Sequence, residues 1–393
     1  MMNRVESPSE TERRSRPGVH GIIFAGGGTG GHIFPGIAIA ESLQSMHGDR
    51  ADCCFAVSDR PLDAEILRVA GRQFVVIPAA PFSARPRKLL RFVGRWGRAV
   101  RTARELIRGM KASCGGGVDV LAMGGFVAAP VVQAARVEKV PVTLVNLDAA
   151  PGLANRWIAR RAARVCSAME VEAGQLGTGR VQMVPPIVRR AARAAGTAAE
   201  CRRMLGLDPN RPTLLVTGAS QGARSINAFV AQFAAGRAGL LQQAGWQVIH
   251  QTGKGEAAAA EQAYAAAGVP AVVREFIDEM GVAWGAADVA VTRCGAGSVA
   301  EAWANAVPSL MMPYPYHKDQ HQKKNAQVLV QAGAAVVCDD LIEPGANDRA
   351  VGTVLERLMR DPQERERMRR AFGVLGPADG ADRIAKLVSG SWR

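Results

Sequence analysis

The chain of 393 residues lacks several features that would assign it to a membrane-spanning, secreted or zinc-binding class. No stretch approaches the roughly 18 uninterrupted apolar residues of a spanning helix. Residues 1–17 are polar and charged without an apolar centre, so we expect a disordered tail over 1–18 and neither a signal peptide nor an anchor. The seven cysteines form no C-x-x-C pair and have no histidines at zinc spacing. We therefore expect free thiols in a reducing compartment, no metal site and no cofactor.

Aromatic and acidic residues are also scarce. Aromatics make up 5% of the chain, without RNA-binding signatures or zinc-finger spacings, so we expect no nucleic-acid partner. The 35 acidic residues face 49 Lys and Arg, which leaves a net charge of +14. This excess predicts an anionic partner, either a phospholipid surface or a phosphate-bearing substrate. Hydrophobic residues make up 48%, enough for the buried cores of two or three soluble domains.

Glycine-rich turns recur at three places where an apolar run meets a helical pattern. They are Gly26–Gly31, Gly218–Gly222 and the stretch Arg293–Glu301. A strand, a tight turn and a helix start direct backbone N–H groups and the positive end of the helix dipole toward one point, which suits a phosphate. Two alternatives stay open. Ser298-x-x-Glu301 fits a capping box, and the first turn formally fits the dinucleotide motif G-x-G-x-x-G.

A nicotinamide site would need an acidic residue after the second strand, and only Asp59 is a fair candidate. His32 argues against that site, because it places an imidazole at the start of the first helix, facing the carboxyl ends of the strands. It is our first candidate for a general base, with a turn-capping role as the alternative. Asp148 follows another predicted strand, Val140–Val145, and is the second candidate, unless it is only a turn or N-cap aspartate.

The order of strands, turns and helices predicts an α/β fold with two doubly wound domains and a cleft between them. We expect a tail over 1–18, a first domain over 19–190, a second over 191–375 and a C-terminal segment over 376–393. Periodicity lapses and Pro clusters between about 185 and 212, where we expect the hinge.

Residues 85–111 contain ten Lys and Arg against the single acid Glu105. Apolar residues recur at steps of three, four and seven, which predicts a basic amphipathic helix. Such a helix can pack its apolar stripe on the core, but the excess charge beside aromatic residues favours contact with anionic headgroups. The residues that we expect at a membrane surface are Leu89, Arg91, Phe92, Val93, Arg95 and Trp96.

Several motifs, in the same order, resemble the MurG family over about residues 21–375. They are Gly27-Gly-Thr-Gly-Gly-His32, Gly124-Gly-Phe126, Pro151-Gly-Leu-Ala-Asn155, Gly218-Ala-Ser-Gln-Gly-Ala-Arg224, His250-Gln-Thr-Gly-Lys254, Glu275-Phe-Ile277, Arg293-x-Gly-Ala296 through Glu301, and His317-Lys-Asp319 through Asn325-Ala326. The resemblance implies the GT-B architecture of two Rossmann-like domains. It also implies an inverting, metal-independent transfer of N-acetylglucosamine from UDP-N-acetylglucosamine to the lipid-linked muramyl-pentapeptide of peptidoglycan synthesis.

The resemblance also implies roles for individual residues. Ser220 and Ala296, Gly297 and Ser298 would hold the pyrophosphate, Glu301 the ribose hydroxyls, and Ile277 the uracil through its backbone. His321 and Gln322 would contact the sugar, and Arg189 would contact the nucleotide sugar. The turn Gly28, Thr29 and Gly30 completes the residues that we expect to bind the donor. A peripheral enzyme on the cytoplasmic face of the inner membrane would follow, because the acceptor is lipid-linked.

Two departures from the family pattern lie on the acceptor or hinge side, at Val145–Asp148 and Pro185–Arg189. They keep open a glycosyltransferase of the same fold that acts on another lipid-linked or hydrophobic acceptor. A UDP-sugar 2-epimerase would share the fold but has no evident use for the basic helix. A lipid-surface binding protein without catalysis would have no use for Glu301 or Gln322.

Overall fold

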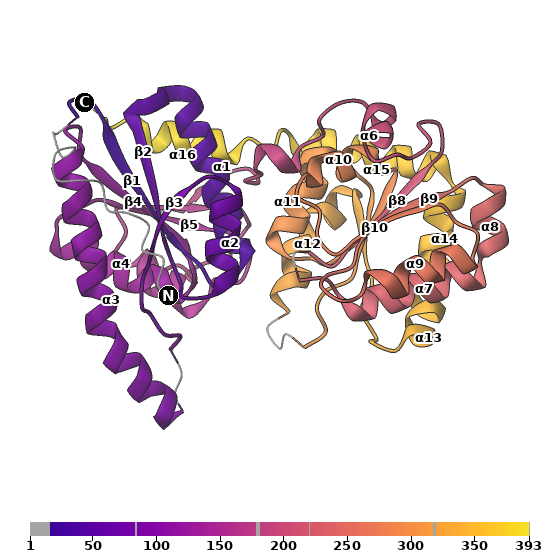
Figure 1. Ribbon diagram of the computed structural model, residues 1–393, viewed down its shortest axis with the longest axis horizontal. Coiled ribbons are helices and arrows are strands. Elements are labelled where there is room, and N and C mark those ends of the chain that lie inside the picture. The colour runs from indigo at the N-terminus through magenta and orange to yellow at the C-terminus, as the bar shows by residue number, and fades with distance from the viewer. Residues whose placement is uncertain (1–15, 83–84, 178–180, 220, 317–319, 393) are drawn as a thin grey trace. The chain divides into compact units, whose positions relative to one another are not determined.

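The computed structural model describes residues 16–82, 85–177, 181–219, 221–316 and 320–392. Most of the predicted tail, 1–15, lies outside the described residues. The chain divides into two compact units (Figure 1). The first comprises residues up to 147, 151–184 and those from 380 on, and the second comprises 148–150 and 185–379. The boundary at 184/185 lies six residues before the one expected from the sequence, and the expected separate segment 376–393 returns to the first unit from Gly380 on.

The first unit is a parallel sheet covered by helices on both faces. Its strands lie in the order β3-β2-β1-β4-β5-β6-β7. The elements are β1 His20–Gly26, α1 Gly30–His47, η2 Gly48–Arg50, β2 Ala51–Val57, α2 Pro61–Val69, β3 Gln73–Val76, α3 Pro86–Ser113, β4 Val118–Gly124, α4 Gly125–Val137, β5 Val142–Asn146, α5 Leu153–Ala159, β6 Arg164–Ser167, β7 Gln182–Met183 and α16 Gly380–Ser389. Helices α1 and α2 lie on one side of this sheet and α3 and α4 on the other (Figure 1).

The second unit is also built on a parallel sheet, whose strands lie in the order β10-β9-β8-β11-β12-β13. Its elements are η3 Arg190–Ala192, α6 Ala198–Met204, β8 Thr213–Thr217, α7 Arg224–Gly236, α8 Ala238–Gln243, β9 Gln247–Gln251, α9 Ala257–Ala266, β10 Ala271–Arg274, α10 Met280–Ala286, β11 Val289–Thr292, α11 Ala296–Asn305, β12 Ser309–Met311, α12 His321–Ala332, β13 Ala335–Val337, α13 Pro344–Asn347, η4 Asp348–Gly352, α14 Thr353–Arg360 and α15 Pro362–Leu375.

Both sheets reverse their strand order at one point, between β1 and β4 and between β8 and β11. All recorded pairings are parallel, and β1, β4, β8 and β11 are buried throughout. Strands buried on both faces read as continuous apolar runs, which is why the sequence revealed them. The predicted pair of Rossmann-like doubly wound domains is confirmed, and ligands of such sheets bind at the carboxyl ends beside the switch point.

The start of α11 differs from one alternative offered by the sequence. Helix α11 begins at Ala296, and its N-cap Gly295 receives no side-chain cap. The capping-box alternative for Ser298 and Glu301 is therefore wrong, because the helix already starts two residues before Ser298. The Glu301 carboxylate bonds elsewhere, as described below.

The C-terminal helix α16 packs against α1 of the first unit. Beyond it, the Trp392 ring stacks on His20 with 4.5 Å between ring centroids. The two nitrogens of His20 each lie 2.7 Å from an oxygen, one on the Gly116 carbonyl and one on Asp119. Trp392 and His20 thus pack together at the amino-terminal edge of the first sheet, the edge opposite to the carboxyl ends of its strands.

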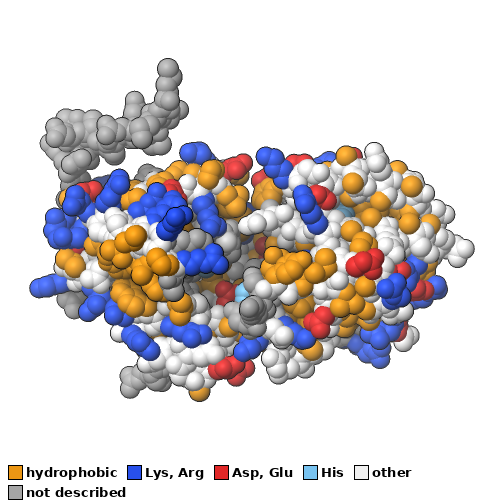
Figure 2. Space-filling model, turned by 90° about the horizontal axis from the view of Figure 1, so that it is seen from below, with side chains coloured by type: hydrophobic (Ala, Val, Ile, Leu, Met, Phe, Trp, Pro, Cys, Tyr) orange, Lys and Arg blue, Asp and Glu red, His pale blue; other side chains and the backbone are white. Residues whose placement is uncertain are grey.

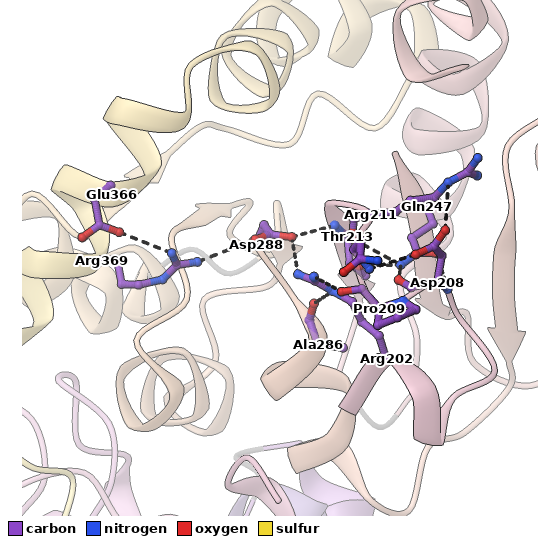
Figure 3. Close-up of polar contacts among 11 residues, drawn as sticks. Arg202, Asp208, Pro209, Arg211, Thr213, Gln247, Ala286, Asp288, Glu366 and Arg369 are labelled. Atoms are coloured by element: carbon purple, nitrogen blue, oxygen red, sulfur yellow. Dashed lines mark hydrogen bonds and ion pairs between the residues drawn. The ribbon is translucent and has the colours of Figure 1, made fainter. Parts of the chain in front are cut away.

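An ion-pair network closes the corresponding edge of the second sheet (Figure 3). Arg202 is 8% exposed and donates to Asp288 at 2.7 Å and to the Ala286 carbonyl at 3.0 Å. Asp288 also accepts from the Thr213 backbone N–H at 2.8 Å, and Gln247 donates to the Asp208 carbonyl at 2.8 Å. The connector before β8 is thereby fixed at the start of β8 and β11, at the opposite end from their carboxyl edge.

Candidate functional site

The first glycine turn, between β1 and α1, is fixed by a carboxylate that sequence reasoning missed. Asp63 in the first turn of α2 is fully buried. Its Oδ2 accepts from the backbone N–H of Gly28 at 2.7 Å and from the backbone N–H and hydroxyl of Ser58 at 3.2 and 2.5 Å. A buried carboxylate is stabilised by such donors. The signal available in the sequence was an acid in the first turn of the helix that follows the second strand.

Asp59, the only fair candidate for a dinucleotide ribose contact, lies on the surface. It pairs with Arg95 of α3 at 3.0 Å, and half of its side chain is exposed. Thr29 and Gly30 continue the turn into α1, and the Thr29 hydroxyl lies 3.3 Å from Nδ1 of His32.

His32 lies in the first turn of α1 beside the carboxyl end of β4. Gly124 and Gly125 have φ of +102° and +77°, in the region that favours glycine. A Cβ at Gly124 would lie 3.2 Å from the His32 Cδ2, and one at Gly125 would lie 3.4 Å from its Cε1. The two glycines therefore make room for the imidazole, which the structure brings to the switch point of the first sheet.

The loop after β5 carries Asp148, which belongs to the second unit. The fully buried Asn325 of α12 donates to the Asp148 Oδ1 at 2.9 Å and accepts from the Ala149 backbone N–H at 2.8 Å. Its amide also lies 3.4 Å from the Cys294 carbonyl. One Asn side chain thus connects the Asp148 carboxylate and the Ala149 backbone to the loop after β11. In the sequence, Asn325 stands out only as part of the motif that runs from His317 to Ala326.

Asn146, one of the departures from the family pattern, has a structural role. It donates to the Ser167 hydroxyl at 3.0 Å and accepts from Asn155 at 2.9 Å. A Cβ at Gly124 would lie 2.9 Å from the Asn155 Oδ1, so this amide pair lies beside the β4 carboxyl end where His32 lies.

The glycine turn after β8 is packed tightly against the loop after β9. Gly222 has φ of +72°, and a Cβ there would lie 2.0 Å from the Thr252 carbonyl oxygen. Gln251, a buried residue that the sequence indicated only as part of a motif, donates to the Ala219 carbonyl at 2.9 Å and accepts from the Ile277 backbone N–H at 2.9 Å. The turn and the Ile277 peptide are thereby connected through one side chain. The candidate Ser220 lies outside the described residues.

The start of α11 presents an open backbone. A Cβ on Gly297 would meet nothing within 4 Å, while Ser298 is buried. One turn further, Glu301 accepts from the Trp284 indole N–H at 2.9 Å. Burial raises the pKa of Glu301, although the Trp284 hydrogen bond and the Arg189 charge oppose the rise. The result is a partly buried carboxylate at the end of a glycine-rich helix start, which can accept hydrogen bonds from ligand hydroxyls.

Arg293 has a structural role at the end of β11. It is buried, donates to Asp340 at 2.7 Å and to the Ser225 hydroxyl at 2.8 Å, and reaches the Met312 carbonyl at 3.1 Å. Burial alone would raise the pKa of Asp340, but hydrogen bonds, led by that from Ser225, hold it below its usual range. This network fixes the ends of β11 and β12 and the start of α7 relative to one another.

The remaining candidates for binding the donor, Arg189, His321 and Gln322, all belong to the second unit. An Arg189 guanidinium nitrogen lies 3.4 Å from the Asp278 carbonyl. Gln322 accepts from the Tyr314 backbone N–H at 2.9 Å, and His321 is the first residue of α12. Among the described residues, no group of three or more His, Cys, Asp and Glu is arranged to hold a metal ion.

The basic helix α3 is longer than its apolar contact with the core. Toward its end, Ala99, Ala103 and Ile107 are buried in the first unit's core. Toward its start, Leu90 and Val93 are 73% and 62% exposed. Figure 1 shows this first half of α3 extending beyond the sheet. The predicted apolar stripe is therefore divided between core packing and an exposed face.

Aromatic contacts connect this exposed face to neighbouring segments. Phe92 contacts Phe82 and Trp96, with ring centroids 5.5 and 5.4 Å apart, and Trp96 contacts Trp157 of α5 at 6.2 Å. Figure 2 shows an apolar patch on the first unit surrounded by Lys and Arg. No described helix is long and apolar enough to cross a bilayer.

Comparison with known proteins gives consistent matches along the chain. Residues 22–167 match the glycosyltransferase family 28 N-terminal domain, and residues 213–384 match its C-terminal domain. A Nocardioides sp. protein named UDP-N-acetylglucosamine–N-acetylmuramyl-(pentapeptide) pyrophosphoryl-undecaprenol N-acetylglucosamine transferase is 35% identical over 370 residues, 93% of this chain and 97% of that protein. A Streptomyces coelicolor protein of the same name is 34% identical over 378 residues, again 93% and 97%.

Solved structures show the same fold. The crystal structure of Acinetobacter baumannii MurG superposes with a TM-score of 0.69 at 24% identity, covering 95% of this chain and 99% of that one. A UDP-N-acetylglucosamine 2-epimerase superposes with a TM-score of 0.60 at 13% identity, covering 95% and 96%.

Proposed function

The chain belongs to glycosyltransferase family 28, and on that premise we propose that it transfers N-acetylglucosamine from UDP-N-acetylglucosamine to the lipid-linked muramyl-pentapeptide of peptidoglycan synthesis. Its relatives are named for this reaction, and the match spans nearly their whole length. The observation that carries the proposal is the carboxyl edge of the second sheet, where the starts of α7 and α11 flank the switch point and Glu301 presents a carboxylate beside them.

On the donor side, we propose that the backbone of Ala296–Ser298 and the turn with Ser220 bind the pyrophosphate. The open surface at Gly297 and the helix dipole support this role. Glu301 would accept from the ribose hydroxyls and the Ile277 backbone would meet the uracil. Arg189, His321 and Gln322 complete the proposed donor site, with Gly28–Gly30 as the corresponding turn of the first unit.

The proposed reaction is an inverting displacement. An acceptor hydroxyl oxygen forms a bond to the anomeric carbon while the bond from that carbon to the UDP oxygen breaks. The hydroxyl proton passes to a base, and the departing pyrophosphate gains negative charge. Preorganised N–H groups at the two helix starts, together with Arg189, would stabilise that charge, so we propose that no metal ion is required.

We propose His32 as the general base and Asp148 as the reserve. An imidazole changes its charge near neutral pH, and the glycines at 124 and 125 leave its ring accessible at the carboxyl edge. The Asp148 Oδ1 already accepts from Asn325, which supports a structural role for that carboxylate.

The exposed half of α3 is the proposed contact with the membrane. Its apolar side chains lie beside Arg91 and Arg95, and each Lys or Arg near an anionic surface contributes about 1 kcal/mol. Aromatic rings such as Trp96 favour the headgroup region. We therefore propose a peripheral enzyme on the cytoplasmic face of the inner membrane, where it would meet its lipid-linked acceptor.

The alternative is a transferase of the same fold with another lipid-linked or hydrophobic acceptor. It is kept open by the altered stretch 145–148, which departs from the family pattern and places Asn146 and Asn155 beside the carboxyl end of β4. The donor-side proposal is common to both alternatives.

Kinetics of transfer in detergent, with EDTA present, test the proposal. Wild type should turn over, and the new glycosidic bond should have the configuration opposite to that of the donor. His32→Ala should lower kcat by about 10²–10⁴-fold with donor affinity retained. Glu301→Ala should weaken UDP binding. Asp148→Asn is the matched control for the assignment of the general base, and it should lower kcat less than His32→Ala does. A larger loss of kcat there than in His32→Ala would reverse the two roles.

Binding to vesicles that contain anionic lipid tests the membrane surface. Val93→Asp should weaken binding by about tenfold or more, because it replaces an exposed apolar side chain, which would enter the lipid, with a charge that the anionic surface repels. Val374→Asp is the control, since Val374 is 87% exposed on α15 of the second unit. Equal binding by both variants would contradict the proposed surface.

A further inference from the structure

Trp284 has no role in the mechanism above, although its indole contacts the carboxylate proposed to bind ribose. Resting on that proposed function, we propose that Trp284 is a positioning residue. Its N–H fixes the Glu301 carboxylate so that the site selects ribonucleotide donors over 2′-deoxyribonucleotides.

The geometry assigns one carboxylate oxygen to the protein and leaves the other for the ligand. Trp284 is fully buried in α10, and its Nε1 lies 2.9 Å from the Glu301 Oε2. Within the described residues, no side chain or backbone group donates to the other oxygen, Oε1. An ionised carboxylate has about four lone-pair sites, so the indole takes one and leaves acceptors for a pair of hydroxyls.

The charge state of Glu301 depends on the same contact. An ionised carboxylate offers only acceptors to the two hydroxyls of a ribose, whereas a protonated one turns one of its oxygens into a donor. Burial raises the pKa of Glu301, and the hydrogen bond from Trp284 lowers it, as does the nearby Arg189 charge. Removal of the indole N–H therefore disturbs both the orientation and the ionisation of the carboxylate.

Helix α10 gives Trp284 a fixed position. A Cβ on Gly281 would lie 1.9 Å from the Arg193 carbonyl oxygen, and one on Gly285 would lie 2.6 Å from the Cys201 sulfur. The helix is thus in close contact with the connector before β8 and cannot shift without breaking that packing. A rigid helix that presents a single N–H to a carboxylate is suited to orienting it.

A purely structural explanation makes a different prediction. Buried indole N–H groups need an acceptor, and Glu301 could serve only that purpose. In that case, loss of the N–H would destabilise the protein or weaken every nucleotide equally. The preference between ribose and deoxyribose would not change.

Calorimetric titration of UDP and of 2′-deoxy-UDP separates the two explanations. It uses wild type, Trp284→Phe and the control Trp246→Phe, which alters another buried Trp of the same unit. Wild type and the control should prefer UDP, and Trp284→Phe should reduce that preference by about fivefold or more, the equivalent of one hydrogen bond. Replacement of Trp284 by 3-benzothienylalanine, which keeps the ring shape and exchanges N–H for sulfur, should act in the same way if the Phe variant folds poorly.

An unchanged preference in the Trp284 variants, with wild type discriminating, would overturn the inference and leave the ribose assignment intact. Equal binding of both nucleotides by wild type would overturn the inference together with the assignment of Glu301 to ribose. Failure of wild type to bind UDP would contradict the proposed function itself.

Discussion

Substitution of Asp63 tests quantitatively whether its carboxylate stabilises the glycine turn between β1 and α1. Asp63→Ala removes the acceptor of two backbone N–H groups, those of Gly28 and Ser58, at a site that is fully buried. A buried donor without a partner costs about 1–3 kcal/mol, so the substitution should cost about 2–6 kcal/mol. Asp63→Asn keeps an acceptor oxygen and loses only the strengthening by charge, which should cost about 1–2 kcal/mol.

Amide hydrogen exchange of peptides from β1, a fully buried strand, measures the unfolding free energy of this unit separately from the other. Asp59→Ala is the matched control four residues earlier. Its side chain is half exposed and paired with Arg95, so the change should remain within about 0.5 kcal/mol. Equal protection in Asp63→Ala and Asp63→Asn would refute the reasoning, because the acceptor would then not be what stabilises the turn.

Three further predictions concern the second unit. Gly222→Ala should abolish UDP binding, because its Cβ would lie 2.0 Å from the Thr252 carbonyl oxygen. Gly297→Ala should fold normally, because its Cβ would meet nothing within 4 Å. Thermal unfolding and titration with UDP check both variants. His250 has a pKa lowered to about 4 by burial, so the unfolded chain binds the extra proton. The stabilisation that comes from the neutral His250 should be fully present above about pH 6.5, and the free energy of unfolding should fall by about 3 kcal/mol as the pH is lowered toward 4. His250→Asn should remove this pH dependence, which hydrogen exchange measured at several pH values would show. Arg202→Met should cost about 1–3 kcal/mol in exchange of β8, because the Asp288 carboxylate loses its 2.7 Å partner and keeps the Thr213 N–H and the more distant Arg369. Unchanged exchange of β8 would contradict the network in Figure 3.

The sheet strands could be predicted because parallel strands buried on both faces have continuous apolar sequences, as β8 does with Thr213-Leu-Leu-Val-Thr217. The glycine turns could be predicted because glycine is the residue that adopts the conformation they require. The helix α3 was predicted from its periodicity, but periodicity could not show where core contact ends, since this depends on where the sheet ends.

The polar residues that arrange the site could not be predicted in the same way. Asp63 and Trp284 carry no spacing that distinguishes them from ordinary helix residues, and Gln251 stands out only as part of a motif. Each has a partner far along the chain: Gly28 lies 35 positions from Asp63, Ile277 lies 26 from Gln251, and Glu301 lies 17 from Trp284. Their contacts arise only when the elements pack. The same holds for the C-terminal return of α16, since no local pattern shows that Trp392 stacks on His20.

A direct test of the proposed transfer gives the wild-type protein labelled UDP-N-acetylglucosamine and two acceptors in detergent. One is the lipid-linked muramyl-pentapeptide, and the other is the same polyprenyl pyrophosphate carrying a sugar without the peptide. We expect label to pass to the first acceptor, with UDP released in equal amount. Binding of the donor without transfer to the muramyl-pentapeptide lipid, or transfer only to the second acceptor, would contradict the proposed reaction.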